Sequence, residues 1–173
     1  MKEKLVFIFA MQREADMVRL PEDDNIRKEI VGISMLDNLP QVSEDEIIIN
    51  LGYCGSNSIK VGTIVEPSIA TDLRTGAQIK LDHLFDTPTT ECFTSDEFVT
   101  KSTQDEPCVY DMELYKIAQL PHKALYSLKI VSDNLNLEDC EKYNDETAWE
   151  KCLEILNDKL KDKFDIDILK ASE

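Results

Sequence analysis

Three acidic residues each follow an apolar, strand-like run, and their types and positions suit acid–base chemistry. Glu113 ends the run Val109–Glu113, Asp133 lies twenty positions further on after Val131-Ser132, and Glu14 follows the first apolar run of the chain. A carboxylate just beyond a strand end lies where open α/β sheets bind their ligands. Two acids at such an edge can divide the work, one accepting hydrogen bonds from hydroxyls and one transferring a proton.

The N-terminal elements that would position Glu14 can be predicted from apolar spacing. Leu5–Ala10 is a continuous apolar run, which is typical of a strand buried on both faces. Met11–Leu20 has helically spaced apolar residues and is followed by Pro21, so a short helix is expected there. Residues 21–28 are polar and predict a loop, Glu29–Leu36 predicts a strand, and Asp37–Asp45 predicts a connection.

The middle of the chain reads as further strands. Ile47–Leu51 is a second buried run, and we expect it to end at a turn that contains Gly52 and Gly55. A loop from Lys60 leads into another strand near Pro67, and Asp72–Leu81 predicts a hairpin at the edge of the sheet.

The C-terminal half predicts the elements that would carry Glu113 and Asp133. Strands are expected at Thr89–Thr94, Cys108–Met112 and Ala124–Val131, and Glu113–Leu120 predicts a helix that stops before Pro121. Residues 144–162 repeat apolar side chains near helical spacing, with Asn144 or Asp145 as the cap, and predict a helix that covers the sheet.

Composition limits the classes of function. At 173 residues and 42% apolar content, the chain suits one domain, residues 1–173, with a core of ordinary size. The net charge of −16 opposes binding to nucleic acid or to an anionic membrane. Five cysteines without a CxxC pair and only two histidines argue against a zinc site or a disulfide framework. The opening apolar run is too short for a signal peptide or a membrane span, so we expect a cytoplasmic protein.

Five motifs occur in one order along nearly the whole chain: Phe9–Glu14, Ile48–Gly55 together with Lys60–Val65, Thr94–Val99, Asp111–Glu113 and Ser132-Asp133. In this order they resemble the nucleoside phosphorylase/nucleosidase superfamily, and most closely the methylthioadenosine/S-adenosylhomocysteine nucleosidases. The resemblance implies a three-layer α/β fold in which helices flank a mixed central β-sheet. It also implies a small purine nucleoside as the substrate, no metal or organic cofactor, and a homodimer.

The resemblance gives each motif a role. Glu14 would activate the attacking water, and Asp133 would assist the departure of the purine. The remaining roles are contacts to ribose (Met112, Glu113), contacts to the base (Phe98, Val99, Ser132, Asp133) and a glycine turn (Gly52, Gly55). An Asp at the base, where relatives that act on 6-oxopurines use Asn, implies a 6-aminopurine such as adenine. Gly52–Gly55 carries no arginine and only Arg13 lies near the first strand, so water is favoured over phosphate as the nucleophile.

The predicted activity is hydrolysis of the N-glycosidic bond of an adenine nucleoside or thionucleoside. Two alternatives stay open: a homologue that binds a purine or nucleoside without cleaving it, and a phosphate-dependent phosphorylase. Residues 37–46 are too few to hold the additional strand, glycine-rich turn and helix that the family has there, so the resemblance is to a shortened form.

Each candidate residue also has a simpler structural interpretation. Glu14 could be an exposed acid in the first turn of a helix, where the helix dipole favours it. Glu113 could begin a helix after a core Met112, and Asp133 could be a cap or turn residue. Phe98 could belong to the core.

Overall fold

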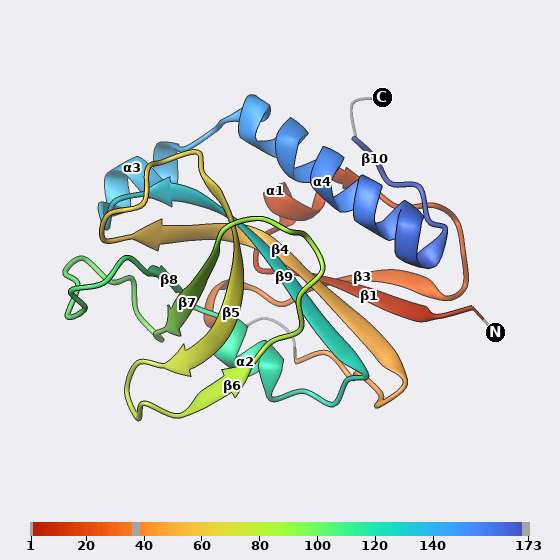
Figure 1. Ribbon diagram of the computed structural model, residues 1–173, viewed down its shortest axis with the longest axis horizontal. Coiled ribbons are helices and arrows are strands. Elements are labelled where there is room, and N and C mark those ends of the chain that lie inside the picture. The colour runs from red at the N-terminus through yellow and green to blue at the C-terminus, as the bar shows by residue number, and fades with distance from the viewer. Residues whose placement is uncertain (1, 36–38, 171–173) are drawn as a thin grey trace.

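The computed structural model describes residues 2–35 and 39–170, and its centre is an eight-stranded mixed β-sheet (Figure 1). The sheet contains β1 (Lys4–Phe9), β3 (Ile26–Ile30), β4 (Glu46–Ser56), β5 (Ile64–Asp72), β6 (Gln78–Lys80), β7 (Thr89–Thr94), β8 (Val109–Asp111) and β9 (Ala124–Asp133). A separate two-stranded sheet pairs β2 (Val18–Arg19) with β10 (Leu169–Lys170).

The pairing of the strands brings three of the predicted motifs together. β4 runs parallel to β1 and β9, β9 pairs antiparallel with β5, and β5 and β8 both run parallel to β7. The end of β4 then pairs antiparallel with β8, so five strands close into a ring. At this closure Gly55 lies opposite both Tyr110 of β8 and Asp133 of β9. The ends of β4, β8 and β9 therefore meet at one place.

Helices cover both faces of the sheet, which confirms the predicted three-layer arrangement (Figure 1). The helices are α1 (Gln12–Ala15), α2 (Leu114–Ala118), α3 (Leu137–Lys142) and α4 (Glu146–Phe164), with a 3-10 turn at Ile33–Met35. α4 packs Trp149 and Leu156 on one face, and α2 packs Leu114 and Ile117 on the other. Asp145 caps α4, because its side chain accepts a hydrogen bond from Ala148 N at 3.1 Å.

Two predicted elements near the N-terminus are wrong in extent. The expected helix Met11–Leu20 ends at Ala15, where Lys28 Nζ donates to its carbonyl at 2.7 Å, and Val18–Arg19 pairs with β10 instead. The expected strand Glu29–Leu36 begins earlier, at Ile26, and ends at Ile30. It stops there because the chain turns through positive φ angles at residues 32, 34 and 35. Leu36 lies outside the described residues.

The expected glycine turn is also wrong, because Gly52 and Gly55 lie inside β4. The strand continues to Ser56 since β9 pairs with it as far as Gly55 and β8 pairs with its last two residues. Neither glycine is among those with positive φ, so conformational freedom is not the reason for them. α3, which follows β9, is not among the elements expected from the sequence.

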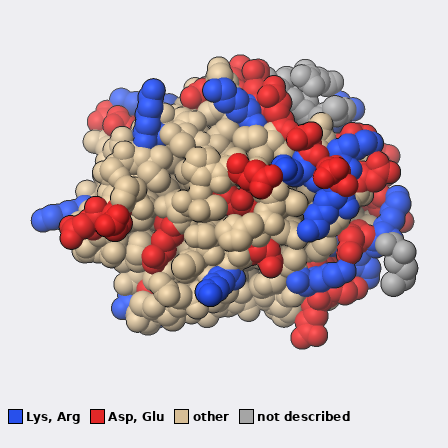
Figure 2. All heavy atoms as spheres, viewed as in Figure 1, with Lys and Arg blue, Asp and Glu red and all other residues tan. Residues whose placement is uncertain are grey.

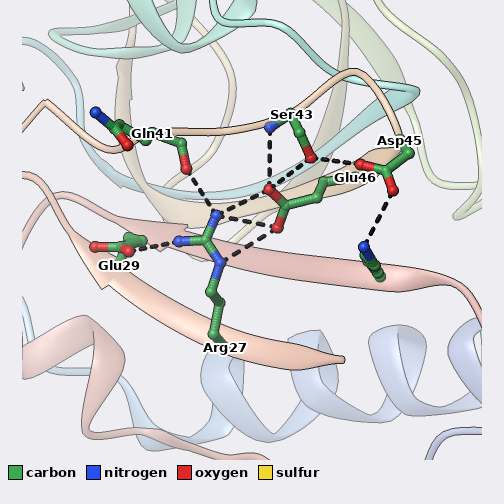
Figure 3. A network of polar contacts seen from close by, with 7 residues as sticks. Arg27, Glu29, Gln41, Ser43, Asp45 and Glu46 are labelled. Carbon is green, nitrogen blue, oxygen red and sulfur yellow. Dashed lines mark hydrogen bonds and ion pairs between the residues drawn. The ribbon is translucent and has the colours of Figure 1, made fainter. Parts of the chain in front are cut away.

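The connection before β4 is held by a polar network around Arg27 of β3 (Figure 3). The Arg27 guanidinium pairs with Glu46 at 3.0 Å and donates to the carbonyl of Gln41 at 2.9 Å. Ser43 N donates to the same Glu46 carboxylate at 3.0 Å. Residues 39–45 form neither helix nor strand, as predicted, and these contacts fix their path beside β3 and β4.

Charged side chains of both signs lie interspersed on the face in Figure 2, around a broad area of other residues. The acidic excess therefore does not gather into one uniform patch on that face. Within the described ranges, no helix has the length and apolar content to cross a membrane. The five cysteines are unpaired, and four of them are buried.

Candidate active site

A cavity of about 300 Å³ opens where β4, β8 and β9 meet. Its size falls at the lower end of small-molecule sites. It is lined by all the sequence-predicted site residues except Gly52: Glu14, Gly55, Phe98, Val99, Met112, Glu113, Ser132 and Asp133. The structure therefore brings together residues that are separated by up to about 120 positions in the sequence.

Glu14 lies in α1 and points inward, with a relative exposure of 1%. Its two carboxylate oxygens accept hydrogen bonds from Met11 N at 2.9 Å and from Tyr53 N at 3.0 Å. The bond from Met11 N caps the start of α1, so Glu14 does lie in the first turn of a helix, as its simpler structural interpretation predicts. The interpretation as an exposed acid is wrong. Burial raises the pKa of Glu14, against the opposing effects of Lys129 and the two N–H groups.

Gly52 and Gly55 allow the carboxylates to approach β4 closely. A Cβ on Gly52 would lie 2.9 Å from Glu14 Oε2, and one on Gly55 would lie 2.8 Å from Asp133 Oδ2. Both distances are shorter than real Cβ contacts allow. The two glycines are therefore needed because a side chain at either position would collide with a carboxylate of the site.

Asp133 ends β9 and is almost fully buried. Its Oδ1 accepts a hydrogen bond from the Ser132 hydroxyl at 2.7 Å, and its Oδ2 accepts one from Leu135 N at 2.9 Å. The Leu135 contact fits the turn-residue interpretation, while the position in the cavity wall fits a ligand-binding one. The two interpretations are compatible, because a side chain fixed by its own turn is also pre-oriented for a ligand.

Glu113 precedes α2, and its carboxylate is buried at the cavity wall. Its Oε2 accepts a hydrogen bond from Ser34 N at 2.8 Å, and within the described part of the chain nothing donates to Oε1. Burial and the neighbouring Asp111 raise the pKa of Glu113 to about 7, although Lys129 and Ser34 oppose the rise. As far as the described residues go, Oε1 is therefore available to accept hydrogen bonds from a ligand.

A buried ion pair, which the sequence did not predict, places one of its members, Asp111, in the cavity lining. Lys129 of β9 is 2% exposed, and its ammonium lies 3.3 Å from Asp111 Oδ2. Lys129 is opposite Gly52 in the β4–β9 register, and a Cβ on Gly52 would lie 3.6 Å from its Nζ. Burial alone would lower the pKa of Lys129, but Asp111, Glu113 and Glu14 together raise it. The signal in the sequence is a lysine inside the apolar run of β9.

The remaining wall is aromatic and apolar. Phe98, Val99 and Met112 are half-buried in the cavity lining, so Phe98 is not a core residue. On the α4 side, the hydroxyl of Tyr53 accepts a hydrogen bond from Trp149 Nε1 at 2.6 Å. Arg13 lies over the Tyr53 ring, 5.1 Å from its centroid, at the edge of the cavity.

Among the described residues, the site supplies acid–base groups and no metal centre. Nowhere in residues 2–35 and 39–170 do three or more His, Cys, Asp or Glu side chains form a group suited to a metal ion. Cys54 lines the cavity, and burial raises the pKa of its thiol, so it is a packed residue rather than a nucleophile.

The fold is shared with solved nucleosidase structures. The MTAN of Chlamydia trachomatis superposes with a TM-score of 0.70 and 16% identity, over 95% of this chain and 100% of that one. The S-adenosylhomocysteine nucleosidase of Streptococcus pyogenes, solved with 5-methylthiotubericidin, gives 0.69 and 14%, over 94% and 98%. Futalosine hydrolase of Helicobacter pylori gives 0.66 and 12%, over 92% and 98%.

These likenesses confirm the predicted fold class and the resemblance at the level of the fold. Searches for a matching protein-family model and for a similar curated protein find none. Solved structures of the Chlamydia trachomatis protein also include one with adenine bound and one of an Asp-to-Asn variant with MTA bound.

Proposed function

We propose that this protein hydrolyses the N-glycosidic bond of an adenine nucleoside or thionucleoside, of the methylthioadenosine or S-adenosylhomocysteine type. The observation that carries the proposal is the convergence of Glu14, Glu113 and Asp133, all buried, on one cavity. Three carboxylates in a largely apolar site suit a reaction that develops positive charge on one part of the substrate and negative charge on another.

Each acid has a place in the reaction. Cleavage of the bond leaves positive charge on the ribose and negative charge on the purine. Asp133 shares a proton with purine N7 and makes the base a better leaving group. Glu113 accepts hydrogen bonds from the ribose 2′- and 3′-hydroxyls, which are stronger because the acceptor is charged. Glu14 takes a proton from the water that attacks the anomeric carbon.

The rest of the cavity wall would bind the base. Phe98 offers an apolar face on which a purine stacks, and Val99 and Ser132 also belong to the cavity lining. Adenine and MTA are ligands of the Chlamydia trachomatis protein, which supports the choice of an adenine compound. In the proposed reaction, no cofactor takes part in any step.

We also propose that residues 1–173 form one nucleosidase-like domain, and that the protein is a cytoplasmic homodimer. The long coverage of the solved chains supports the first statement. Ile33 and Leu137 are exposed apolar residues in the cavity lining, and a second copy at the cavity mouth would cover them.

The test of this proposal is release of the free base. Purified protein is incubated with methylthioadenosine, S-adenosylhomocysteine, adenosine and inosine, with and without phosphate, and the products are resolved by chromatography. We expect adenine to be released without phosphate, and inosine to be a poor substrate. Release that requires phosphate would establish a phosphorylase instead. No release, together with thermal stabilisation by adenine, would establish a binding protein that has lost the chemistry.

The rate of hydrolysis should fall in acid. Glu113 must be ionised to accept two hydrogen bonds from the ribose, and burial beside Asp111 raises its pKa to about 7. We therefore expect kcat/KM to rise as the pH rises through about 7. The pKa of Glu14 is also raised, so the acid limb belongs to both groups together. A profile that is flat across this range would contradict the assignment of Glu113.

A further inference from the structure

Ser34 has an unusual backbone for its residue type. It lies in the turn Ile33–Met35 beside the cavity, is buried, and has φ of +58°. This is the left-handed region, which serine adopts at a cost, and Met35 shares the same φ. Such strain persists only where the surroundings determine the conformation, and it occurs most often at functional sites.

The surroundings of Ser34 account for all three of its polar groups. Its N–H donates to Glu113 Oε2 at 2.8 Å, and its hydroxyl donates to the carbonyl of Asp96 at 3.0 Å. Its own carbonyl accepts from Lys116 Nζ at 3.1 Å, and Lys116 is paired with Asp96 at 2.5 Å. These partners are 79, 62 and 82 positions away in the sequence.

The contacts of Ser34 join Glu113, in the cavity wall, to the segment that leads into another part of that wall. Glu113 is the proposed ribose acid, and Asp96 opens the segment that leads to Phe98 and Val99, where the base is proposed to lie. The neighbouring Ile33 lies in the cavity lining and is 51% exposed. Ser34 therefore links the ribose side of the cavity to the base side through its own N–H and hydroxyl groups.

We propose that Ser34 is a positioning residue that orients the Glu113 carboxylate and ties it to the base-binding segment, so that ribose and purine are held in register. The proposal rests on the proposed function, because it takes Glu113 as the ribose acid. With Oε2 held by the Ser34 N–H, the carboxylate keeps one orientation and offers Oε1 to the substrate.

Ser34→Gly separates positioning from a purely structural role. Glycine removes the hydroxyl bond to Asp96 but also relieves the left-handed strain, and the two changes have opposite effects on folding stability. Ser34→Ala removes the same bond and keeps the strain. Asp86→Gly is the matched control, because Asp86 has φ of +56° and lies in an exposed loop outside the cavity lining.

The measurements are steady-state kinetics with methylthioadenosine across pH, and thermal unfolding. For Ser34→Gly we expect an unfolding temperature near that of the wild type and a KM raised roughly tenfold, as for the loss of one well-placed hydrogen bond. We expect kcat to change less than KM. The acid limb of kcat/KM should move to higher pH, because without the hydroxyl anchor to Asp96 the backbone N–H of residue 34 is held less firmly on Glu113 Oε2 and favours its ionised form less. Asp86→Gly should leave all of these kinetic values unchanged.

A double-mutant cycle identifies the route of the effect. If Ser34 acts through Glu113, then Ser34→Gly should cost much less in a Glu113→Gln background than in the wild type. Wild-type KM and pH profile in Ser34→Gly, or equal effects in both backgrounds, would overturn the proposal. If the wild type cleaves no nucleoside, the proposed function fails by itself. The same variants are then compared by their Kd for adenosine, and an unchanged Kd in Ser34→Gly would overturn the positioning role.

Discussion

Glu14→Gln is expected to lower the rate of base release by roughly 10²–10⁴-fold while adenine still binds. The glutamine side chain has nearly the same shape, so it fills the space over Gly52, but it cannot take a proton from water. The raised pKa of Glu14 supports this role, because a carboxylate whose pKa lies closer to neutrality is a stronger base. The measurement is single-turnover release of adenine, with adenine affinity measured by calorimetry on the same sample.

The hydrogen bonds of Glu14 make a measurement of stability necessary as a control in this experiment. Both of its oxygens accept hydrogen bonds from backbone N–H groups, so the NH₂ group of the substituted side chain must oppose one of them, and a modest loss of stability is expected. Unfolding temperatures therefore accompany the kinetics. Glu154→Gln, at an exposed acid on α4, makes the same chemical change outside the cavity and should have no effect. Activity within about threefold of the wild type in the Glu14→Gln variant would exclude Glu14 as the base.

The parts of the fold that can be predicted are those where one physical signal dominates. β1, β4 and β9 are apolar runs buried on both faces, and the strand Thr89–Thr94 has the bounds that the sequence predicts. The α4 helix has a cap and a helical apolar spacing that agree with each other. The bounds of the early helix are wrong because four residues, Gln12–Ala15, give too little pattern to fix an end.

What cannot be predicted depends on contacts between distant residues. The glycines of β4 resemble a turn in the sequence because their purpose, space for Glu14 and Asp133, exists only once the sheet is assembled. Ser34 shows no local signal of left-handed backbone, since its conformation is set by partners more than 60 positions away. Lys129 does carry a signal, because a lone cation in an apolar strand requires a buried anion.

Lys129→Met is expected to have the largest effect on stability of any single change in the site. Methionine has a similar length and no charge, so the variant leaves Asp111 buried without its partner and removes a cation that acts on Glu14 and Glu113. Removing one member of a buried ion pair typically costs about 3–5 kcal/mol. The free energy of unfolding from urea denaturation measures this, with the exposed Lys60→Met as a control expected within about 0.5 kcal/mol of the wild type.

The loss of stability in Lys129→Met should depend on pH, and the direction of this dependence follows from Glu14 and Glu113. Lys129 lowers the pKa values of Glu14 and Glu113, so without it both pKa values rise further above those of the unfolded chain. An acid whose pKa is higher in the folded state binds protons more tightly there, so stability falls as pH rises from the unfolded pKa through the folded one. Lys129→Met should therefore be closer to the wild type at about pH 5 than at about pH 8.

A second substitution tests whether the ion pair itself is responsible. Adding Asp111→Asn removes the unpaired charge while its side chain can still accept a hydrogen bond from Thr94 or Leu114, so part of the lost stability should return. Additive losses from the two substitutions, or a loss that is the same at both pH values, would show that packing at Lys129 and not its charge accounts for the lost stability. Recovery in the double variant would instead show that the unpaired charge of Asp111 accounts for the lost stability.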